Sequence, residues 1–260
     1  SCAFGTSVPG LRLDLLGDLP VPIPRDDETL QRVAGLVRRC VEQRELYFRD
    51  LQFARRVIEE IPEIREAQGA SAHRKARCTM WTGPLRTLCA WNAASTGSVL
   101  STLRSRWAGR LGDVLSAGIA YGPRFARIAC QLPYGFDFMT QRDVFLIRPL
   151  PRRIAHPDVG DSQLFVRPDT LLVAAQGTLG EGEIFGKVML ARGRLAKVAY
   201  SGHVLRLALK EGYAPTLFAY FSTLVGMQLL HSTAVGTKLL SLREDLLRDL
   251  PIPDLTERQQ

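Results

Sequence analysis

The sequence predicts an α/β (α+β) protein in which a short-stranded sheet with flanking helices is combined with one long helix. Three observations favour this fold: a heptad pattern of apolar residues from 27 to 61, short apolar runs bounded by Gly and Pro between 111 and 210, and an 18-residue segment that occurs twice. The 260 residues are 46% hydrophobic and 23% charged, which is enough apolar material for a folded core. No run of eighteen apolar residues occurs, so no membrane-spanning helix is expected.

The repeated segment lies near each end of the chain. Residues 5–22 are GTSVPGLRLDLLGDLPVP and residues 236–253 are GTKLLSLREDLLRDLPIP, with eleven of eighteen positions identical. Each copy ends in Pro-x-Pro, which should be extended because proline fixes its own φ and disfavours helix at the preceding residue. We therefore expect residues 1–24 to be the tail of a preceding module and residues 111–255 to be a domain that ends with the second copy.

The segment 25–66 is expected to be a long spacer helix. Asp26 or Asp27 can cap its first turn, and nine of ten positions spaced alternately by three and four residues from 30 to 61 are apolar. This spacing predicts a coiled-coil contact with another long helix; the alternative is an amphipathic helix that packs on its own domain. The expected helix–helix interface consists of Leu30, Val33, Val37, Cys40, Tyr47, Leu51, Ala54 and Ile58.

Positive charge is concentrated in one part of the chain. Residues 67–153 contain thirteen Lys or Arg and three acidic residues, whereas the rest of the chain has twenty-one Lys or Arg and twenty-three acidic residues. Such a basic segment favours a polyanionic partner, above all nucleic acid, over a merely solvated basic surface. Within it, residues 67–110 show weak periodicity and are expected to form a basic linker.

The cysteine pattern argues against two common roles of cysteine, disulfide bonding and zinc binding. Five cysteines without C-x-x-C spacing, together with four scattered histidines, argue against a disulfide framework and against a zinc site. We expect no metal or other cofactor, a reducing cytoplasmic environment and no secretory signal.

From residue 111 onward the chain is expected to alternate between short strands and helices. The strand predictions are 125–130, 144–147, 170–174, 186–191 and 204–209, and the helix predictions are 213–231 and 239–250.

Four segments occur in an order that resembles the target-recognition domain of type I restriction-modification specificity subunits, the methylase-specificity family. They are LGDVLSAGIAYGPRFARI (111–128), VRPDTLLVAAQGTLGE (166–181), SGHVLRL (201–207) and VGTKLLSLREDLLRDLPIPDL (235–255). The resemblance implies a module that recognises double-stranded DNA, attached to a long helix that pairs with a second such helix. It also implies methyltransferase (modification) subunits as partners, a nuclease or translocase subunit as a further possible partner, and a role in phage defence.

Base recognition needs side chains with paired donors and acceptors on loops that reach a groove. The glycines of 176–180 also suit a close approach to phosphate. For each candidate the alternative is an ordinary turn residue with a solvated side chain. The residues expected to bind DNA are Tyr121, Arg124, Arg127, Gln141, Arg142, Gln176, Thr178, His203 and Lys238.

The sequence contains no G-x-S-x-G, H-E-x-x-H or nucleotide-binding glycine motif, so we expect a non-catalytic protein. Substitution of Arg124 or Gln176 should reduce the preference for the target sequence, whereas substitution of Arg152 or Arg153 should weaken all duplexes equally. The alternative function is an interaction or assembly protein that acts through its long helix, with self-association as one form of that assembly.

Overall fold

The computed structural model describes residues 3–4, 10–11, 20, 22–72, 96–146, 151–178, 183–236 and 239–253. The chain divides into two compact units, residues 1–51 and 52–260. Most of the first copy of the repeat lies outside the described residues, as does the segment 73–95 of the expected linker. Among the helices that the structure describes, none has the length and apolar content needed to cross a bilayer.

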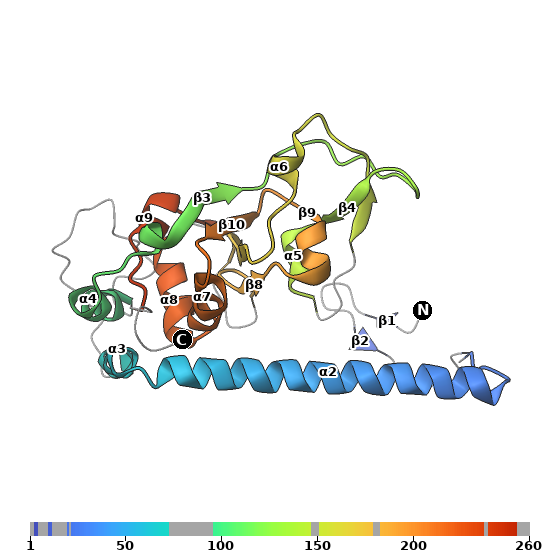
Figure 1. The fold of residues 1–260 in the computed structure, drawn as a ribbon, viewed down its shortest axis with the longest axis horizontal. Helices are drawn as coiled ribbons and strands as arrows, with labels where there is room; N and C mark the ends of the chain where they lie inside the picture. The colour runs from blue at the N-terminus through green and yellow to red at the C-terminus, as the bar shows by residue number, and fades with distance from the viewer. Residues whose placement is uncertain are drawn as a thin grey trace. The chain divides into compact units, whose positions relative to one another are not determined.

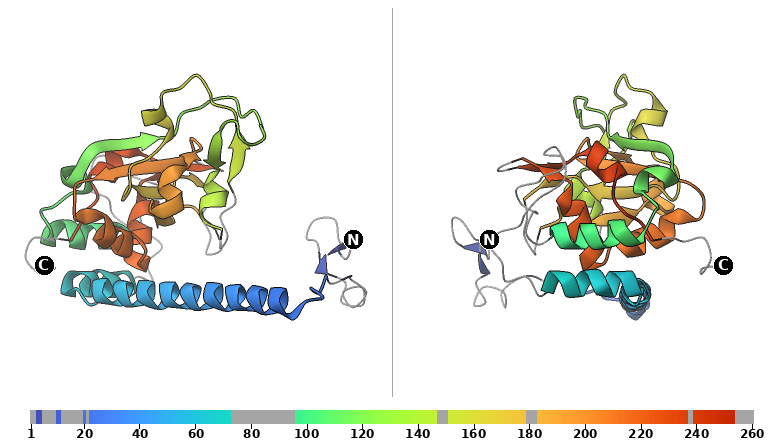
Figure 2. Two further views of the ribbon diagram at one scale, coloured as in Figure 1. Left: turned by 45° about the vertical axis from the view of Figure 1, so that its right-hand side comes forward. Right: turned by 90° about the vertical axis from the view of Figure 1, so that its left-hand side faces the viewer.

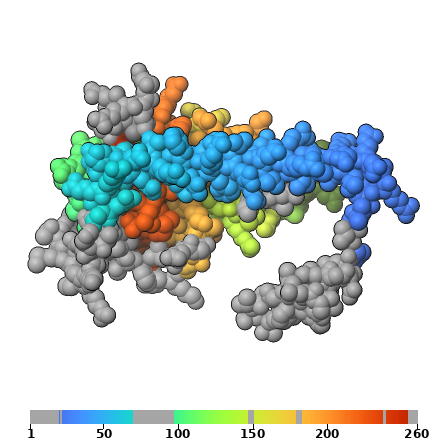
Figure 3. Space-filling model, turned by 90° about the horizontal axis from the view of Figure 1, so that it is seen from below, coloured from blue at the N-terminus to red at the C-terminus, as the bar shows by residue number. Residues whose placement is uncertain are grey.

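In the first unit two short strands, β1 (Ala3–Phe4) and β2 (Gly10–Leu11), pair antiparallel. Helix α2 (Asp27–Glu59) begins in this unit and continues into the second. The side chain of Asp26 accepts a hydrogen bond from the backbone N–H of Thr29 at 2.6 Å, which caps the first turn as the sequence predicts. The 33 residues of α2 make a rod about 50 Å long, and Figure 3 shows its surface.

The second unit contains three small sheets and several helices. Its four-stranded sheet is entirely antiparallel in the order β3-β10-β6-β8, and two three-stranded sheets have the orders β11-β12-β7 and β5-β4-β9. The strands are β3 (Leu115–Tyr121), β4 (Phe136–Met139), β5 (Arg152–Ile154), β6 (Leu171–Ala174), β7 (Gln176–Gly177), β8 (Val188–Leu190), β9 (Ala199–Tyr200), β10 (Val204–Leu209), β11 (Ala234–Val235) and β12 (Leu240–Leu242). The helices are α3 (Pro62–Ala72), α4 (Thr96–Arg106), η2 (Leu111–Val114), α5 (Gln141–Val144), α6 (Asp161–Leu164), η3 (Gly193–Lys197), α7 (Tyr213–Phe221), α8 (Leu224–Ser232) and α9 (Glu244–Arg248).

One face of the four-stranded sheet carries the main core. Leu207 of β10 is paired with Ile119 of β3 and Leu171 of β6, so these three side chains share a face. That face packs on α7 and α8, which lie together on one side of the sheet (Figures 1 and 2). Because the residues on this face are large and aliphatic, burial against the two helices is the main source of stability for this part of the fold.

The helices α3 and α4 extend the same core. Ile64 and Ala67 of α3 and Val99 and Leu103 of α4 are fully buried, and both helices contact α8. Residues 96–106, expected to belong to a linker, are therefore part of the folded core.

The second copy of the repeat closes the domain. Its Leu250 and Ile252 are buried, Leu111 donates a backbone hydrogen bond to the Leu250 carbonyl at 2.9 Å, and Ile252 donates to the Gly109 carbonyl at 3.2 Å. Pro251 forms an antiparallel bridge with Arg110, which confirms that this part of the motif is extended. The motif therefore joins the segment after α9 to residues 109–111.

Several predicted elements differ from those observed. Strands β6, β8 and β10 match three predictions, but residues 125–130 form no strand and residue 144 ends α5. The predicted helix 213–231 is two helices, because the Thr223 hydroxyl accepts a hydrogen bond from the Gly226 N–H and starts a new one. The predicted helix 239–250 consists of β12 followed by α9, because residues 240–242 pair with β7 and β11 instead of with their own neighbours.

Candidate nucleic-acid interface

Two segments distant in sequence meet to form a basic cleft. The turn after β3 and the turn before β10 pack backbone against backbone: a Cβ on Gly122 would lie 2.7 Å from the Ser201 carbonyl oxygen, so only glycine fits there. This contact brings Arg124 and Arg127 beside His203 around a cleft of about 180 Å³. Three of the residues predicted to bind DNA are thus gathered at one place, and each is exposed.

The two arginines of this cleft differ in how firmly they are held. The Arg127 guanidinium lies 5.0 Å from the centre of the Phe138 ring, a cation–π contact that orients its side chain. Arg124 makes no ion pair with any carboxylate in the described part of the chain. An exposed guanidinium without a partner keeps all its donors for a ligand, and its planar fork matches the O6 and N7 acceptors of guanine.

Tyr121 lies at the edge of this region, but its hydroxyl is already engaged. The hydroxyl donates a hydrogen bond to the Leu242 carbonyl, which joins β3 to β12. Burial raises the pKa of this phenol, and the nearby Glu244 carboxylate raises it further, so the hydroxyl remains protonated at neutral pH. The residue is 38% exposed and remains available for contact.

The expectation that Gln141 is exposed on a loop is wrong. Gln141 is the first residue of α5 and is only 9% exposed. Its Nε2 donates to the Gln176 carbonyl at 2.6 Å, and its Oε1 accepts from the Gln176 N–H at 3.1 Å. The amide therefore serves as a local substitute for a strand neighbour, because both its donor and its acceptor are used by backbone. The adjacent Arg142 is exposed.

The remaining predicted residues lie around β7 or outside the described ranges. Gln176 is half-buried and Thr178 is exposed, whereas Lys238 lies outside the described residues. Gly177 does not offer space for a phosphate: a Cβ there would lie 3.1 Å from the Cβ of Phe185, so the glycine is needed for internal packing.

A larger groove of about 700 Å³ adjoins the cleft and shares Pro123 with it. Its floor is the second face of the four-stranded sheet, where Gly118, Ala120 and Ala208 replace the large residues of the core face. The small side chains leave this part of the sheet uncovered and create the groove.

Arg206 on the same face was not singled out from the sequence, although a charge inside the apolar strand VLRLAL is an available signal. It is 7% exposed and its two terminal nitrogens donate to the carbonyls of Gln163, Leu164 and Tyr200, at 2.6, 3.1 and 3.4 Å. Burial lowers its pKa to about 10, so the guanidinium is still charged at neutral pH. The side chain holds the α6 segment against the sheet and places a buried positive charge beside the groove.

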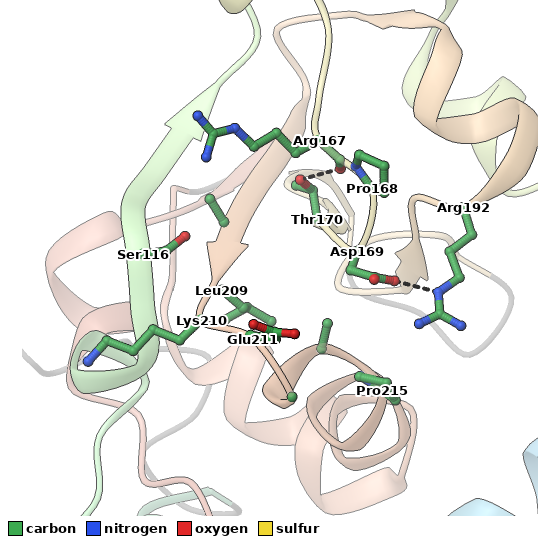
Figure 4. A pocket seen from close by; sticks show the side chains of 13 residues that line it. Ser116, Arg167, Pro168, Asp169, Thr170, Arg192, Leu209, Lys210, Glu211 and Pro215 are labelled. Atoms are coloured by element: carbon green, nitrogen blue, oxygen red, sulfur yellow. Dashed lines mark hydrogen bonds and ion pairs between the residues drawn. The ribbon is translucent and has the colours of Figure 1, made fainter.

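A third pocket of about 410 Å³ shares Arg167, Thr170 and Ala208 with the groove (Figure 4). Two of its cations are occupied: Arg192 pairs with Asp169, and Lys210 donates to the Asp113 carbonyl at 2.7 Å. Within the described ranges Arg167 has no carboxylate partner, and its side chain points away from the Asp169–Arg192 pair in Figure 4. The three cavities together form a connected surface lined by Arg124, Arg127, Arg167, Arg192, Arg206 and Lys210.

The residues expected to form the helix–helix interface fall into three groups by their burial. Ile58 is buried and Ala54 is packed in the core of the second unit, so this end of α2 contacts its own domain. Leu51 is half-buried. The remaining five residues are exposed, among them Val37 at 57%: they are Leu30, Val33, Val37, Cys40 and Tyr47.

In the part of the chain that the structure describes, no three His, Cys, Asp or Glu side chains gather where they could ligate a metal ion. The cavities described above offer guanidinium donors and apolar surface. They suit an anionic ligand with exposed acceptors.

No protein-family model and no curated protein matches the sequence. Solved structures do. The S subunit of a type I restriction-modification system from M. genitalium is 14% identical with a TM-score of 0.33, and 96% of this chain and 55% of that one are covered. The HsdS subunit from Thermoanaerobacter tengcongensis is 16% identical with a TM-score of 0.28, and the match covers 93% of this chain and 53% of that one.

A chain from a structure that describes complex assembly and conformational transition of the type I R-M system is 16% identical with a TM-score of 0.40, with 97% of this chain and 54% of that one covered. The chain thus spans about half the length of the solved proteins it matches. It is structurally similar, at low sequence identity, to the specificity subunits of type I restriction-modification systems.

Proposed function

We propose that this chain recognises a specific sequence in double-stranded DNA and has no catalytic activity of its own. The observation that carries the proposal is the basic cleft, where Arg124, Arg127 and His203 come from two distant segments and all face solvent. Bidentate guanidinium contacts to guanine are the commonest specific contacts in the major groove, and the cleft presents two guanidinium groups together.

Phosphate contacts are assigned to exposed arginines outside the cleft. Arg142, Arg152 and Arg167 are exposed and form no ion pair with a described carboxylate. Such residues add affinity without sequence preference, because every phosphate is alike. Arg153 is a poor candidate for this role, since its guanidinium is bound to Asp137 at 3.1 Å and to two backbone carbonyls of the adjacent loop.

The partners follow from the sequence resemblance. We propose methyltransferase (modification) subunits as the proteins that this module directs to DNA, with a nuclease or translocase subunit as a further partner. The exposed apolar residues of α2 supply a surface for assembly with a second long helix.

Selection from a library of random duplexes tests the proposal. The purified protein should enrich one family of sequences, and the Arg124→Ala variant should enrich it less strongly. A library that remains random after repeated selection with a folded protein would refute sequence-specific recognition.

An assembly protein that acts through α2 is the second candidate, favoured by the exposure of Val33, Val37 and Tyr47, at 47%, 57% and 44%. Co-purification from the native host separates the two functions. Replacement of these three residues by polar ones should remove a helix-dependent partner but leave duplex selection by the isolated protein intact.

A further inference from the structure

The loop between β3 and β4 ends in an apolar tip that the cleft does not use. Leu132 is 77% exposed and Tyr134 is 73% exposed, the highest values among the exposed large hydrophobic side chains of the described residues. Exposed apolar side chains next to one another cost solvation free energy, so their presence on a solvent-facing turn suggests a ligand.

The tip is held in one conformation by its own hydrogen bonds. The Tyr134 N–H donates to the Gln131 carbonyl at 3.0 Å and closes the turn. The Tyr134 carbonyl accepts from Arg153 Nε at 2.9 Å and from Cys130 Sγ at 3.4 Å. The backbone that carries the two side chains is therefore braced by hydrogen bonds within the turn and to Arg153 of β5.

Gly135 fixes the base of the same turn. Its φ is +67°, and a Cβ there would lie 2.0 Å from the Ile154 carbonyl oxygen, so the position accepts only glycine. The close approach anchors the turn on β5, and the loop extends from the four-stranded sheet to reach β4 (Figure 1). The result is a rigid support for two projecting apolar side chains.

The surroundings of the tip are cationic. No acidic residue occurs between Val114 and Phe136, and Asp137 is paired with both Arg153 and Arg194, at 3.1 and 3.9 Å. Two exposed arginines lie at the base of the loop: Arg127 is stacked on the Phe138 ring, and Arg152 is the strand partner of Phe138. A polyanion is therefore the partner with matching charge.

We propose that Leu132 and Tyr134 form a wedge that enters between adjacent base pairs of duplex DNA and partly unstacks them. Apolar side chains inserted at a base step are a known means by which proteins kink a duplex. The exposed Arg152, at the base of the loop, supplies a phosphate contact beside the wedge. The wedge favours flexible pyrimidine–purine steps, so it adds sequence preference at a position without base hydrogen bonds. This inference rests on the proposed recognition of duplex DNA.

A protein partner is disfavoured by the size of the tip. A stable protein interface buries roughly 800 Å² on each partner and involves about 20–30 residues on each side. The apolar tip consists of two exposed side chains two residues apart in the chain, which suits the gap between two base pairs better than a protein surface.

Fluorescence of 2-aminopurine tests the wedge. The base is placed in turn at each step of a duplex recovered from the random library, and fluorescence is measured with and without protein. Unstacking should raise the signal at one step, and Leu132→Ser with Tyr134→Ser should abolish the rise and weaken binding on the order of tenfold or more. Both side chains are exposed, so the variant should keep the wild-type melting temperature.

Leu224→Ser is the matched control, because Leu224 is 57% exposed but lies on α8, outside the loop. It should retain the fluorescence rise. An absent rise with a bound duplex, or a rise that survives in the double variant, overturns the wedge but leaves the proposed function intact. Failure of the wild-type protein to bind any duplex overturns both the wedge and the proposed function. If the double variant binds DNA like the wild type but loses a protein partner, the wedge is also overturned.

Discussion

Where β3 pairs with β10, the two faces of the four-stranded sheet have opposite compositions. One face presents Leu205 and Leu207, fully buried beneath α7 and α8. On the other face the same strand presents Arg206 and Ala208, and the adjacent β3 presents Gly118 and Ala120. Because side chains alternate along a strand, a single strand contributes to the core on one side and to an open groove on the other.

This difference separates stability from recognition. Large aliphatic residues on the core face fill the space under the helices, and their removal leaves cavities. Small residues on the groove face leave room for a ligand beside a buried cation. Substitutions on the two faces should therefore change different measured quantities.

The largest effect is expected on the core face. Leu207→Ala should lower the free energy of unfolding by about 2–5 kcal/mol, because a fully buried leucine is replaced by a cavity. Urea denaturation measures the change. Ala208→Ser on the groove face is the neighbouring control and should change stability by less than about 0.5 kcal/mol; equal losses for both variants would contradict the assignment of faces.

Arg124→Ala should act on recognition alone. Loss of one bidentate contact should reduce the preference for the selected duplex over a random one by about 1–3 kcal/mol, with an unchanged melting temperature. Competition binding measures the preference, and Arg56→Ala, an exposed arginine of α2, is the control that should retain it. The assignment fails if both variants lose the same preference.

Gln141→Ala, unlike Arg124→Ala, should lower stability and leave the target preference unchanged. Removal of its amide leaves the Gln176 N–H and carbonyl without their partner, which should lower the free energy of unfolding by about 1–3 kcal/mol. The folded variant should select the same duplex as the wild type. A changed target preference without a stability loss would return Gln141 to direct base recognition.

Arg152→Ala and Arg167→Ala should each weaken target and random duplexes by the same factor. Each should also reduce the slope of log affinity against log salt by about 0.9, the value for one phosphate contact. Arg192→Ala is the comparison. Arg192 already pairs with Asp169, so its replacement should change the slope less. A slope that is equal in all three variants and the wild type would exclude these phosphate contacts.

The smallest effect concerns His156, in the segment that precedes α6. A hydrogen bond with the Asp161 carboxylate, 2.9 Å away, raises the pKa of this imidazole above its ordinary value. Its contribution to stability is therefore complete below about pH 6.5 and is lost as the pH rises through the folded pKa. NMR titration of the His156 ring should show the raised pKa, and Asp161→Asn should return it towards the ordinary value; an unchanged pKa in the variant would exclude the pair.

The sequence was most informative where local pattern and final structure agree. Strand β10 matches the prediction 204–209 because its apolar residues are β-branched or aliphatic and bounded by turns. Strand β3 was missed because LSAGIAY consists mainly of small residues without clear alternation. Those small residues are the ones that create the groove, so the feature that hides the strand also defines the site.

For the candidate DNA-binding residues too, the sequence shows local pattern but not which distant segments meet. Turn composition predicts Arg124, Arg127 and His203 separately, and the fold brings them together through the contact at Gly122. The sequence does not show that Gln141 is buried, because its partner, Gln176, is 35 residues away and no local pattern shows the pairing.

The salt dependence of duplex binding by the purified protein tests recognition through the basic cleft most directly. We predict a steep fall in affinity as salt rises, with a smaller slope and no target preference when Arg124, Arg127 and Arg152 are replaced together. An affinity that does not change with salt, or a triple variant that binds and discriminates like the wild type, would contradict recognition of DNA through the basic cleft.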